Sequence, residues 1–178
     1  MFSKVLAFGL GALALVRAAP VFSFQTPMLS CSVNVDASVA PVTSNAIEPG
    51  VYKIYNEAFG PAQLRSYTLN TPIYVSYTRE EPGPFGLWNV ISVGSNEYKI
   101  VNAGLSSVAL VSQGQIITEP RQGGGDNFAI EPAGEGMFTI QLPDRDRVWT
   151  VDASGPRSDV SLKPQDGASE ARWKFVKL

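Results

Sequence analysis

The stretch Val51-Tyr52-Lys53-Ile54 recurs in altered form further along the chain, as Glu97-Tyr98-Lys99-Ile100 and as Met137-Phe138-Thr139-Ile140. Each version carries an aromatic residue, one intervening residue and an isoleucine. The isoleucines of consecutive stretches lie 46 and 40 residues apart. A second set of aromatic residues, each opening another apolar alternation, is spaced by 40 and 45 residues: Trp88, Phe128 and Trp173. Because two independent markers keep a similar period, the sequence predicts a threefold internal repeat.

Each repeat unit contains four short stretches that are apolar or alternate in polarity and are bounded by turn residues, as is typical of strands. The predicted strands are 51–55, 63–69, 73–77, 88–93, 98–102, 108–112, 115–119, 128–131, 138–142, 148–152, 159–163 and 172–176. No window shows a sustained period of 3.6 residues, so we expect almost no helix. Twelve strands in three four-strand units predict an all-β fold, the pseudo-threefold β-trefoil, in which six strands form a barrel and six form a hairpin cap.

The start of the chain differs from the repeats. A short basic start, Met1-Phe2-Ser3-Lys4, precedes an apolar run at 5–16, and small residues lie just before Ala19. These are the three parts of a secretory signal peptide, and the apolar run is too short to span a bilayer comfortably. We therefore expect a signal peptide at 1–18, a flexible leader at 19–47 and a β-trefoil domain at 48–178, in a secreted protein.

Charge and cysteine content limit the partners. Without Lys4 and Arg17, the mature chain would hold 12 basic and 16 acidic residues, with no basic cluster. An acidic surface repels phosphate backbones, so we expect no nucleic-acid partner. No other apolar run is long enough to suggest a membrane partner. The single cysteine, Cys31, cannot form an internal disulfide, so an apolar core must hold the domain together.

The composition also excludes several kinds of active site. The chain has no histidine, which removes Ser-His-Asp, Cys-His and histidine-metal sites together. Acidic residues occur in two predicted turns, at 80–81 and 144–147. A glycosidase could use two carboxylates alone, but these turns are typical of solvated surface. We expect no catalytic residues, no metal and no cofactor, and we predict that the protein is not an enzyme.

The repeats share a longer frame of residues: Pro49-Gly50-x-Tyr52-x-Ile54-x-Asn56, Trp88, Tyr98-x-Ile100-x-Asn102-x-Gly104, Phe128-x-Ile130-Glu131-Pro132, Phe138-x-Ile140 and Trp149. Over residues 48–178 this frame resembles the mushroom β-trefoil serine-protease inhibitors of the cospin kind. The resemblance implies fungal origin and a reactive loop between the second and third strands of the first unit, with an asparagine contacting the protease. The matching residues here are Leu69, Asn70, Thr71 and Pro72.

The sequence of this loop suits such a role. Pro72 fixes its own φ angle and favours extended geometry at Thr71. A loop held extended before binding loses little ordering entropy when it enters a protease cleft. A plain hairpin turn is the alternative interpretation, because asparagine and proline are common in turns.

The same frame is also similar to mushroom β-trefoil lectins and to ricin-B-type lectin modules, most closely in the third unit. An aspartate placed like Asp152 binds sugar hydroxyls in ricin-type units, although the Gln of their Gln-x-Trp motif is absent from all three units here. The resemblance implies a glycan site in which Trp149 stacks on the sugar beside Asp152. The alternative is a buried Trp149, since strand alternation places Trp149 and Asp152 on opposite faces. Other aromatic candidates are Tyr55, Tyr67 and Tyr74.

These observations predict a secreted, non-enzymatic recognition protein. The first hypothesis is an inhibitor whose partner is a serine protease. The second is a lectin whose partner is a glycan. The third is a secreted effector or structural protein with neither activity.

Overall fold

The computed structural model describes residues 46–78, 80–143, 146–152 and 155–178. Within these residues the chain forms twelve strands and three short 3-10 helices. The strands are β1 (Gly50–Asn56), β2 (Gln63–Arg65), β3 (Tyr74–Ser76), β4 (Leu87–Gly94), β5 (Glu97–Asn102), β6 (Ser107–Ser112), β7 (Gln115–Pro120), β8 (Phe128–Gly134), β9 (Met137–Gln141), β10 (Arg147–Val151), β11 (Arg157–Pro164) and β12 (Trp173–Lys177). The 3-10 helices are η1 (Gly83–Gly86), η2 (Arg121–Gly123) and η3 (Ser169–Ala171).

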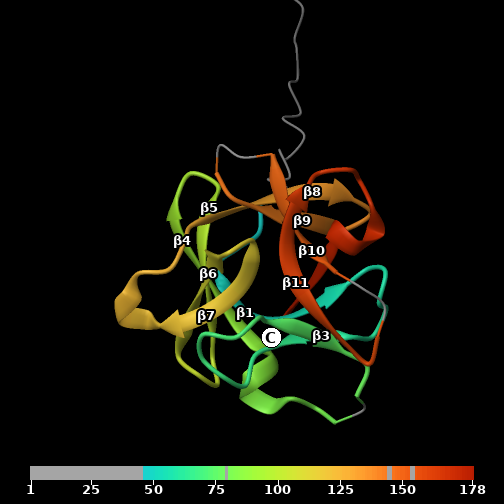
Figure 1. The fold of residues 1–178 in the computed structure, drawn as a ribbon. Coiled ribbons are helices and arrows are strands. Elements are labelled where there is room, and N and C mark those ends of the chain that lie inside the picture. Colours follow the sequence, from blue (N-terminus) through green and yellow to red (C-terminus); the bar gives the residue numbers. More distant parts are fainter. Residues whose placement is uncertain (1–45, 79, 144–145, 153–154) are drawn as a thin grey trace, which may run out of the picture. The chain divides into compact units, whose positions relative to one another are not determined.

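Six of the strands close into an antiparallel barrel. Figure 1 shows the arrangement of the elements in space. Around it, β1 pairs with β4, β4 with β5, β5 with β8, β8 with β9, β9 with β12, and β12 again with β1. The other six strands form the hairpins β2–β3, β6–β7 and β10–β11. These hairpins pair with one another through β3–β11, β11–β7 and a bridge between Pro72 and Ile117. The predicted β-trefoil of three four-strand units is confirmed.

The residues that mark the repeat fill the core. Burial alternates along β1, where Tyr52, Ile54 and Asn56 point inward, as the period of two in a strand requires. Equivalent positions are fully buried in all three repeats: Ile54, Ile100 and Ile140 on one set of strands, and Trp88, Phe128 and Trp173 on the other. Burial of large apolar side chains is the main favourable term in folding, so these six positions hold the barrel together.

The strand β2 is shorter than predicted. The sequence predicts a strand at 63–69, but β2 ends at Arg65. The chain reverses direction soon afterwards, with Asn70 at a φ of 58°. Asparagine is one of the few residues that adopts this left-handed conformation readily. The last residues of the predicted strand therefore belong to the loop and turn that follow β2.

Several predictions fall on the first part of the chain. The predicted signal peptide at 1–18, Cys31 and nearly all of the predicted leader lie outside the described residues. Ile47, which the prediction placed in the leader, is buried in the core. The packed domain therefore begins earlier than residue 48. Among the residues described, no helix is long and apolar enough to cross a membrane.

The junction between the first and second repeats is held by Asn102, which is fully buried. Its Nδ2 donates to the carbonyl of Phe85 at 2.8 Å, and its Oδ1 accepts from the N–H of Leu105 at 3.0 Å. The side chain thus satisfies two backbone groups that would otherwise be buried without partners. It ties the end of β5 to η1 of the preceding repeat.

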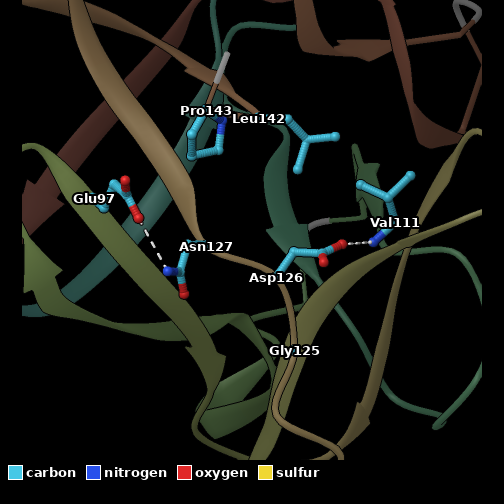
Figure 2. Close-up of a pocket in the computed structure, with 7 residues that line it drawn as sticks. All are labelled: Glu97, Val111, Gly125, Asp126, Asn127, Leu142 and Pro143. Atoms are coloured by element: carbon cyan, nitrogen blue, oxygen red, sulfur yellow. Dashed lines mark hydrogen bonds between the residues drawn. The ribbon is translucent and has the colours of Figure 1, made fainter. Parts of the chain in front are cut away.

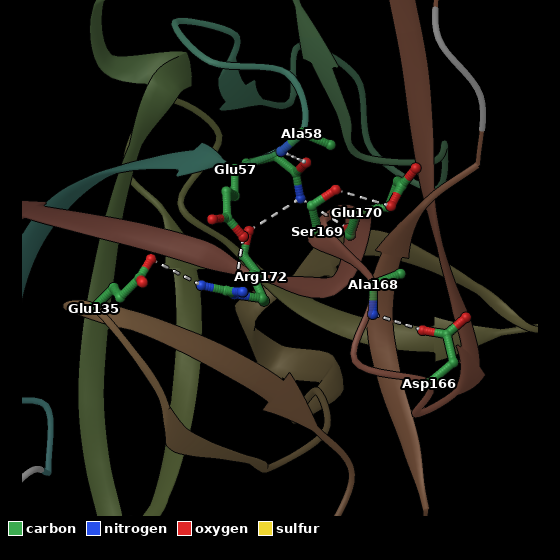
Figure 3. A network of polar contacts seen from close by, with 9 residues as sticks. Glu57, Ala58, Glu135, Asp166, Ala168, Ser169, Glu170 and Arg172 are labelled. Carbon is green, nitrogen blue, oxygen red and sulfur yellow. Dashed lines mark hydrogen bonds and ion pairs between the residues drawn. The ribbon is translucent and has the colours of Figure 1, made fainter.

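Asn56 plays the same part where the third repeat meets the first. Its Nδ2 donates to the carbonyls of Glu170 and Arg172, at 2.8 and 3.3 Å, and its Oδ1 accepts from the N–H of Ala58. Beside it, the guanidinium of Arg172 forms an ion pair with Glu57 at 2.8 Å (Figure 3). Two of the three junctions are therefore fastened by an asparagine.

We predict that Asn102→Leu lowers the free energy of unfolding by about 1–3 kcal/mol, because the Phe85 carbonyl and the Leu105 N–H lose their buried partner. Urea unfolding monitored by tryptophan fluorescence measures the change. The matched control is Asn89→Leu on β4, whose side chain is partly exposed and makes no hydrogen bond among the described residues. We expect the control to stay within about 0.5 kcal/mol of wild type. An equally small effect of Asn102→Leu would contradict the fastening role.

A second prediction concerns alkaline pH. The hydroxyl of Tyr52 donates to the carbonyl of Glu48 at 2.5 Å, and that of Tyr98 donates to the carbonyl of Ile47 at 2.9 Å. Burial raises the pKa of both tyrosines, because it disfavours the charged phenolate. The stability that depends on the neutral hydroxyls is therefore complete below about pH 10, the pKa of tyrosine in an unfolded chain, and is lost as the pH rises through the higher folded pKa.

Tyrosinate absorbance should accordingly show a late-ionising fraction in the folded protein. This fraction should shrink in the Tyr52→Phe, Tyr98→Phe double variant and leave Tyr74, whose pKa burial also raises. The stability of the double variant should fall less steeply than that of wild type above about pH 10. A wild-type titration completed in one step near the pKa of free tyrosine would show that the two hydroxyls are not held in this way.

Candidate functional site

The predicted inhibitory residues lie in the loop that joins β2 to β3, residues 66–73, which we call the Asn70 loop. Asn70 is exposed, and its neighbours Leu69, Thr71 and Pro72 are partly buried. The structure therefore places the four residues together, with Asn70 as the one most open to solvent.

Contacts with the neighbouring strand β7 hold this loop in place. The N–H of Asn70 donates to the carbonyl of Thr118 at 2.6 Å, and Pro72 forms a bridge with Ile117. At the start of the loop, the hydroxyls of Ser66 and Thr118 are 3.1 Å apart and buried. A loop fixed by its own protein before binding has less conformational entropy to lose when a partner docks. The Asn70 loop is preorganised in this sense.

The conformation of the loop differs from the expectation. Asn70 has a left-handed backbone with φ of 58°, and the hydroxyl of Thr71 donates to the carbonyl of Thr68 at 2.9 Å, closing a turn. A substrate-like segment would instead be extended at the residue that contacts the protease. The loop is therefore a turn at Asn70, as in the alternative interpretation of this segment, because the chain must reverse between β2 and β3 within a few residues.

The predicted role of Trp149 in stacking on a sugar is also wrong. Trp149 is fully buried in the core and has no face open to solvent. Its ring packs edge-on against Phe128 and Trp173, with centroids 4.9 and 6.4 Å away. On β10 it occupies the inward position that Leu64 holds in the first repeat, so the barrel uses it for packing.

Asp152 follows β10, and its polar atoms are engaged within the protein. Its carboxylate pairs with the ammonium of Lys163 at 3.0 Å and accepts a hydrogen bond from the hydroxyl of Ser161. Its N–H donates to the carbonyl of Asp159 at 3.0 Å. The structure therefore does not bring Trp149 and Asp152 together, in agreement with the alternation of β10.

Two of the other candidate tyrosines form a separate aromatic group. Tyr67 is exposed, and its ring lies against those of Phe85 and Tyr74, at centroid distances of 4.9 and 6.5 Å. The guanidinium of Arg157 lies 3.9 Å from the centre of the Tyr74 ring. That cation covers one face of Tyr74, which leaves this face unable to stack on a sugar.

The third candidate, Tyr55, lines a pocket that sequence reasoning did not find. The pocket has a volume of about 350 Å³ and lies between β1, β2 and the connection from β3 to β4. We call it the Arg65 pocket. Aromatic Tyr55 and Tyr77 line it together with polar side chains that include Arg65, Thr78 and Glu80. Aromatic faces beside hydrogen-bonding groups are what a small polar ligand requires.

A further pocket of about 610 Å³ opens at the junction between the second and third repeats (Figure 2). Here the third repeat has Leu142 where the other repeats have a fastening asparagine. The carboxylates at this pocket already accept hydrogen bonds: Asp126 from the N–H of Val111 at 2.7 Å, and Glu97 from Asn127 at 3.0 Å. These carboxylates hold the loop rather than form a paired acid and base. Within the described residues, no three metal-binding side chains gather at one place.

No protein-family model matches the sequence, and no curated protein matches it. Solved structures do resemble it. The designed threefold-symmetric protein ThreeFoil superposes with a TM-score of 0.64 at 17% identity, over 72% of this chain and 99% of that one. A proteinase inhibitor from Coprinopsis cinerea gives 0.62 at 14% identity, over 75% of this chain and 100% of that one. An exo-beta-1,3-galactanase from Clostridium thermocellum gives 0.63 at 18% identity, over 75% of this chain but 31% of that one. At these identities the likeness shows the fold alone.

Proposed function

We propose that this protein is a secreted inhibitor of serine endopeptidases that acts through the Asn70 loop. The observation that carries the proposal is an exposed loop tip fixed by contacts from β7, including the 2.6 Å hydrogen bond from Asn70 to Thr118. Preorganised loops of this kind bind clefts at low entropic cost. The likeness to the Coprinopsis cinerea proteinase inhibitor, which extends over the whole of that chain, supports the proposal. Such a function needs no catalytic residue, metal or cofactor.

The geometry of the loop indicates how it would inhibit. Because Asn70 is left-handed and its N–H is already bonded to Thr118, the peptide bond after Asn70 is not presented in extended form. The loop would fill the protease cleft as a rigid turn, with the side chains of Leu69 and Asn70 at its tip. We therefore expect the chain to block the cleft without being cut there.

Inhibition should be measured as residual activity of a panel of trypsin-like and asparaginyl peptidases. We predict that Asn70→Gly weakens inhibition at least tenfold, because glycine keeps the left-handed turn while removing the contacting side chain. The matched control is Gln113→Gly, in the β6–β7 hairpin, whose φ of 51° is similar. This control should inhibit like wild type.

Mass spectrometry of the incubated mixtures tests the mode of inhibition, and should find the segment 66–73 intact. Wild-type protein that inhibits none of the panel at micromolar concentration would sink the proposal. Equal inhibition by Asn70→Gly and wild type would show that Asn70 is not the residue that contacts the protease.

Glycan binding is the second candidate, and the Arg65 pocket is the observation that favours it. Tyr77 is 45% exposed, and its ring also contacts Phe59, with centroids 5.9 Å apart, so its orientation is supported from within. Together with Tyr55 it offers apolar ring surface next to the polar groups of Gln63 and Thr78. Sugars are bound by this combination of stacking and directed hydrogen bonds.

For this candidate, we predict that a glycan array detects binding that Tyr77→Ala reduces at least tenfold, because the stacking surface is lost. Tyr77→Phe, which keeps the ring, should bind nearly as wild type does. Asp152→Ala should also bind normally, since its carboxylate is taken by Lys163 and Ser161. An array without any bound glycan would reject the candidate. Failure of both the array and the protease panel would favour the third hypothesis, an effector or structural protein.

A further inference from the structure

Arg65 is a buried cation. Only 4% of the residue is exposed. Its guanidinium donates three hydrogen bonds: Nε to the carbonyl of Gln63 at 3.3 Å, Nη1 to the hydroxyl of Thr78 at 2.8 Å, and Nη2 to the carbonyl of Ser76 at 3.3 Å. All three acceptors are neutral. None of the ion pairs found among the described residues includes Arg65.

The fold itself does not require a cation at this position. Strand pairing places Arg65 opposite Tyr74, and the equivalent positions of the other hairpins hold Leu110 and Thr150. Both of these are neutral, so the same hairpin position is filled twice without charge. Burying a charge without a counterion is costly, and hydrogen bonds to neutral groups offset only part of that cost. The requirements of the fold therefore do not explain why a cation is buried at this position.

The surroundings of Arg65 suggest where a counterion would lie. Its side chain lines the Arg65 pocket together with Tyr55 and Tyr77. Two acidic residues also line this pocket, Glu80 and Glu81, but both are exposed, and Glu81 is paired with Lys53 at 3.1 Å. The carboxylates of Glu80 and Glu81 are thus exposed to water, and that of Glu81 is also paired with Lys53, whereas the guanidinium of Arg65 is buried.

We propose that the Arg65 pocket binds the carboxylate of an acidic sugar residue, a hexuronate. A guanidinium has five N–H groups, and the three described bonds leave one on each terminal nitrogen. Two such donors match the two oxygens of a carboxylate, the pairing for which arginine is best shaped. The tyrosines then supply ring surface for the sugar. This inference rests on the second candidate function and names the class of glycan.

The test compares D-glucuronate with D-glucose, which share a ring but differ in the carboxylate. Binding to the full secreted chain is followed by NMR titration. We expect glucuronate to bind at least tenfold more tightly than glucose. Arg65→Leu, which copies the residue at the equivalent position of the second repeat, should reduce glucuronate binding to the level of glucose. The matched control is Arg121→Leu, which removes an exposed arginine on η2 and should change nothing.

A second measurement on wild-type protein does not depend on whether Arg65→Leu folds. Sodium acetate should displace glucuronate, whereas sodium chloride at the same ionic strength should displace much less, because acetate carries the carboxylate that Arg65 would pair with. Glucose binding as tightly as glucuronate, or no displacement by acetate, would overturn the inference while leaving glycan binding intact. If neither sugar binds and the glycan array is also empty, the inference and the second candidate function fail together.

Discussion

The structure depends on the filling of one closed barrel by the same set of side chains from each repeat. Six strands pair in a ring, and six of the side chains in its core are equivalent residues of the three repeats: Ile54, Ile100 and Ile140, with Trp88, Phe128 and Trp173. Close packing of this kind tolerates little change in volume. Inward positions are therefore occupied by the core, and a binding surface can use only the loops and the outward positions of the strands. Trp149 is an example. The sequence around it resembles a sugar-binding motif, but its side chain is buried in the core and cannot contact a sugar.

Buried polar groups add a second constraint, which the repeats meet unequally. The indole N–H of Trp88 donates to the carbonyl of Leu64 at 3.0 Å, and that of Trp173 donates to the carbonyl of Trp149 at 2.9 Å. The second repeat has Phe128 at this position, and its side chain has no N–H to donate. There the backbone N–H of Asp126 donates to the carbonyl of Ala109 instead, at 3.2 Å. At this position a backbone N–H replaces the indole N–H where the sequence symmetry fails, and Asp126 also lines the pocket of about 610 Å³.

The sequence predicts the architecture well because that architecture is periodic. The aromatic and isoleucine markers recur every 40 to 46 residues, and strand alternation separates inward from outward positions, so all twelve strands are found near their predicted places. The end of β2 was predicted wrongly, because the chain reverses after Arg65 in a turn that contacts β7 and contains the left-handed residue Asn70. The Arg65 pocket was missed for another reason. Tyr55, Arg65 and Tyr77 are unremarkable separately, and only the barrel brings them together around a buried charge.

Both proposed surfaces draw on the first repeat, yet they rest on different physical properties. The Asn70 loop depends on rigidity, which comes from backbone contacts with β7 and would persist whatever side chain stood at position 70 in a left-handed turn. The Arg65 pocket depends on an unbalanced charge, which a neutral residue such as Leu110 avoids at the equivalent place. Rigidity is compatible with a stable fold, whereas a buried cation without a counterion opposes it. The Arg65 pocket is thus the feature of this β-trefoil that stability alone does not explain, and a bound carboxylate is the simplest group that would balance it.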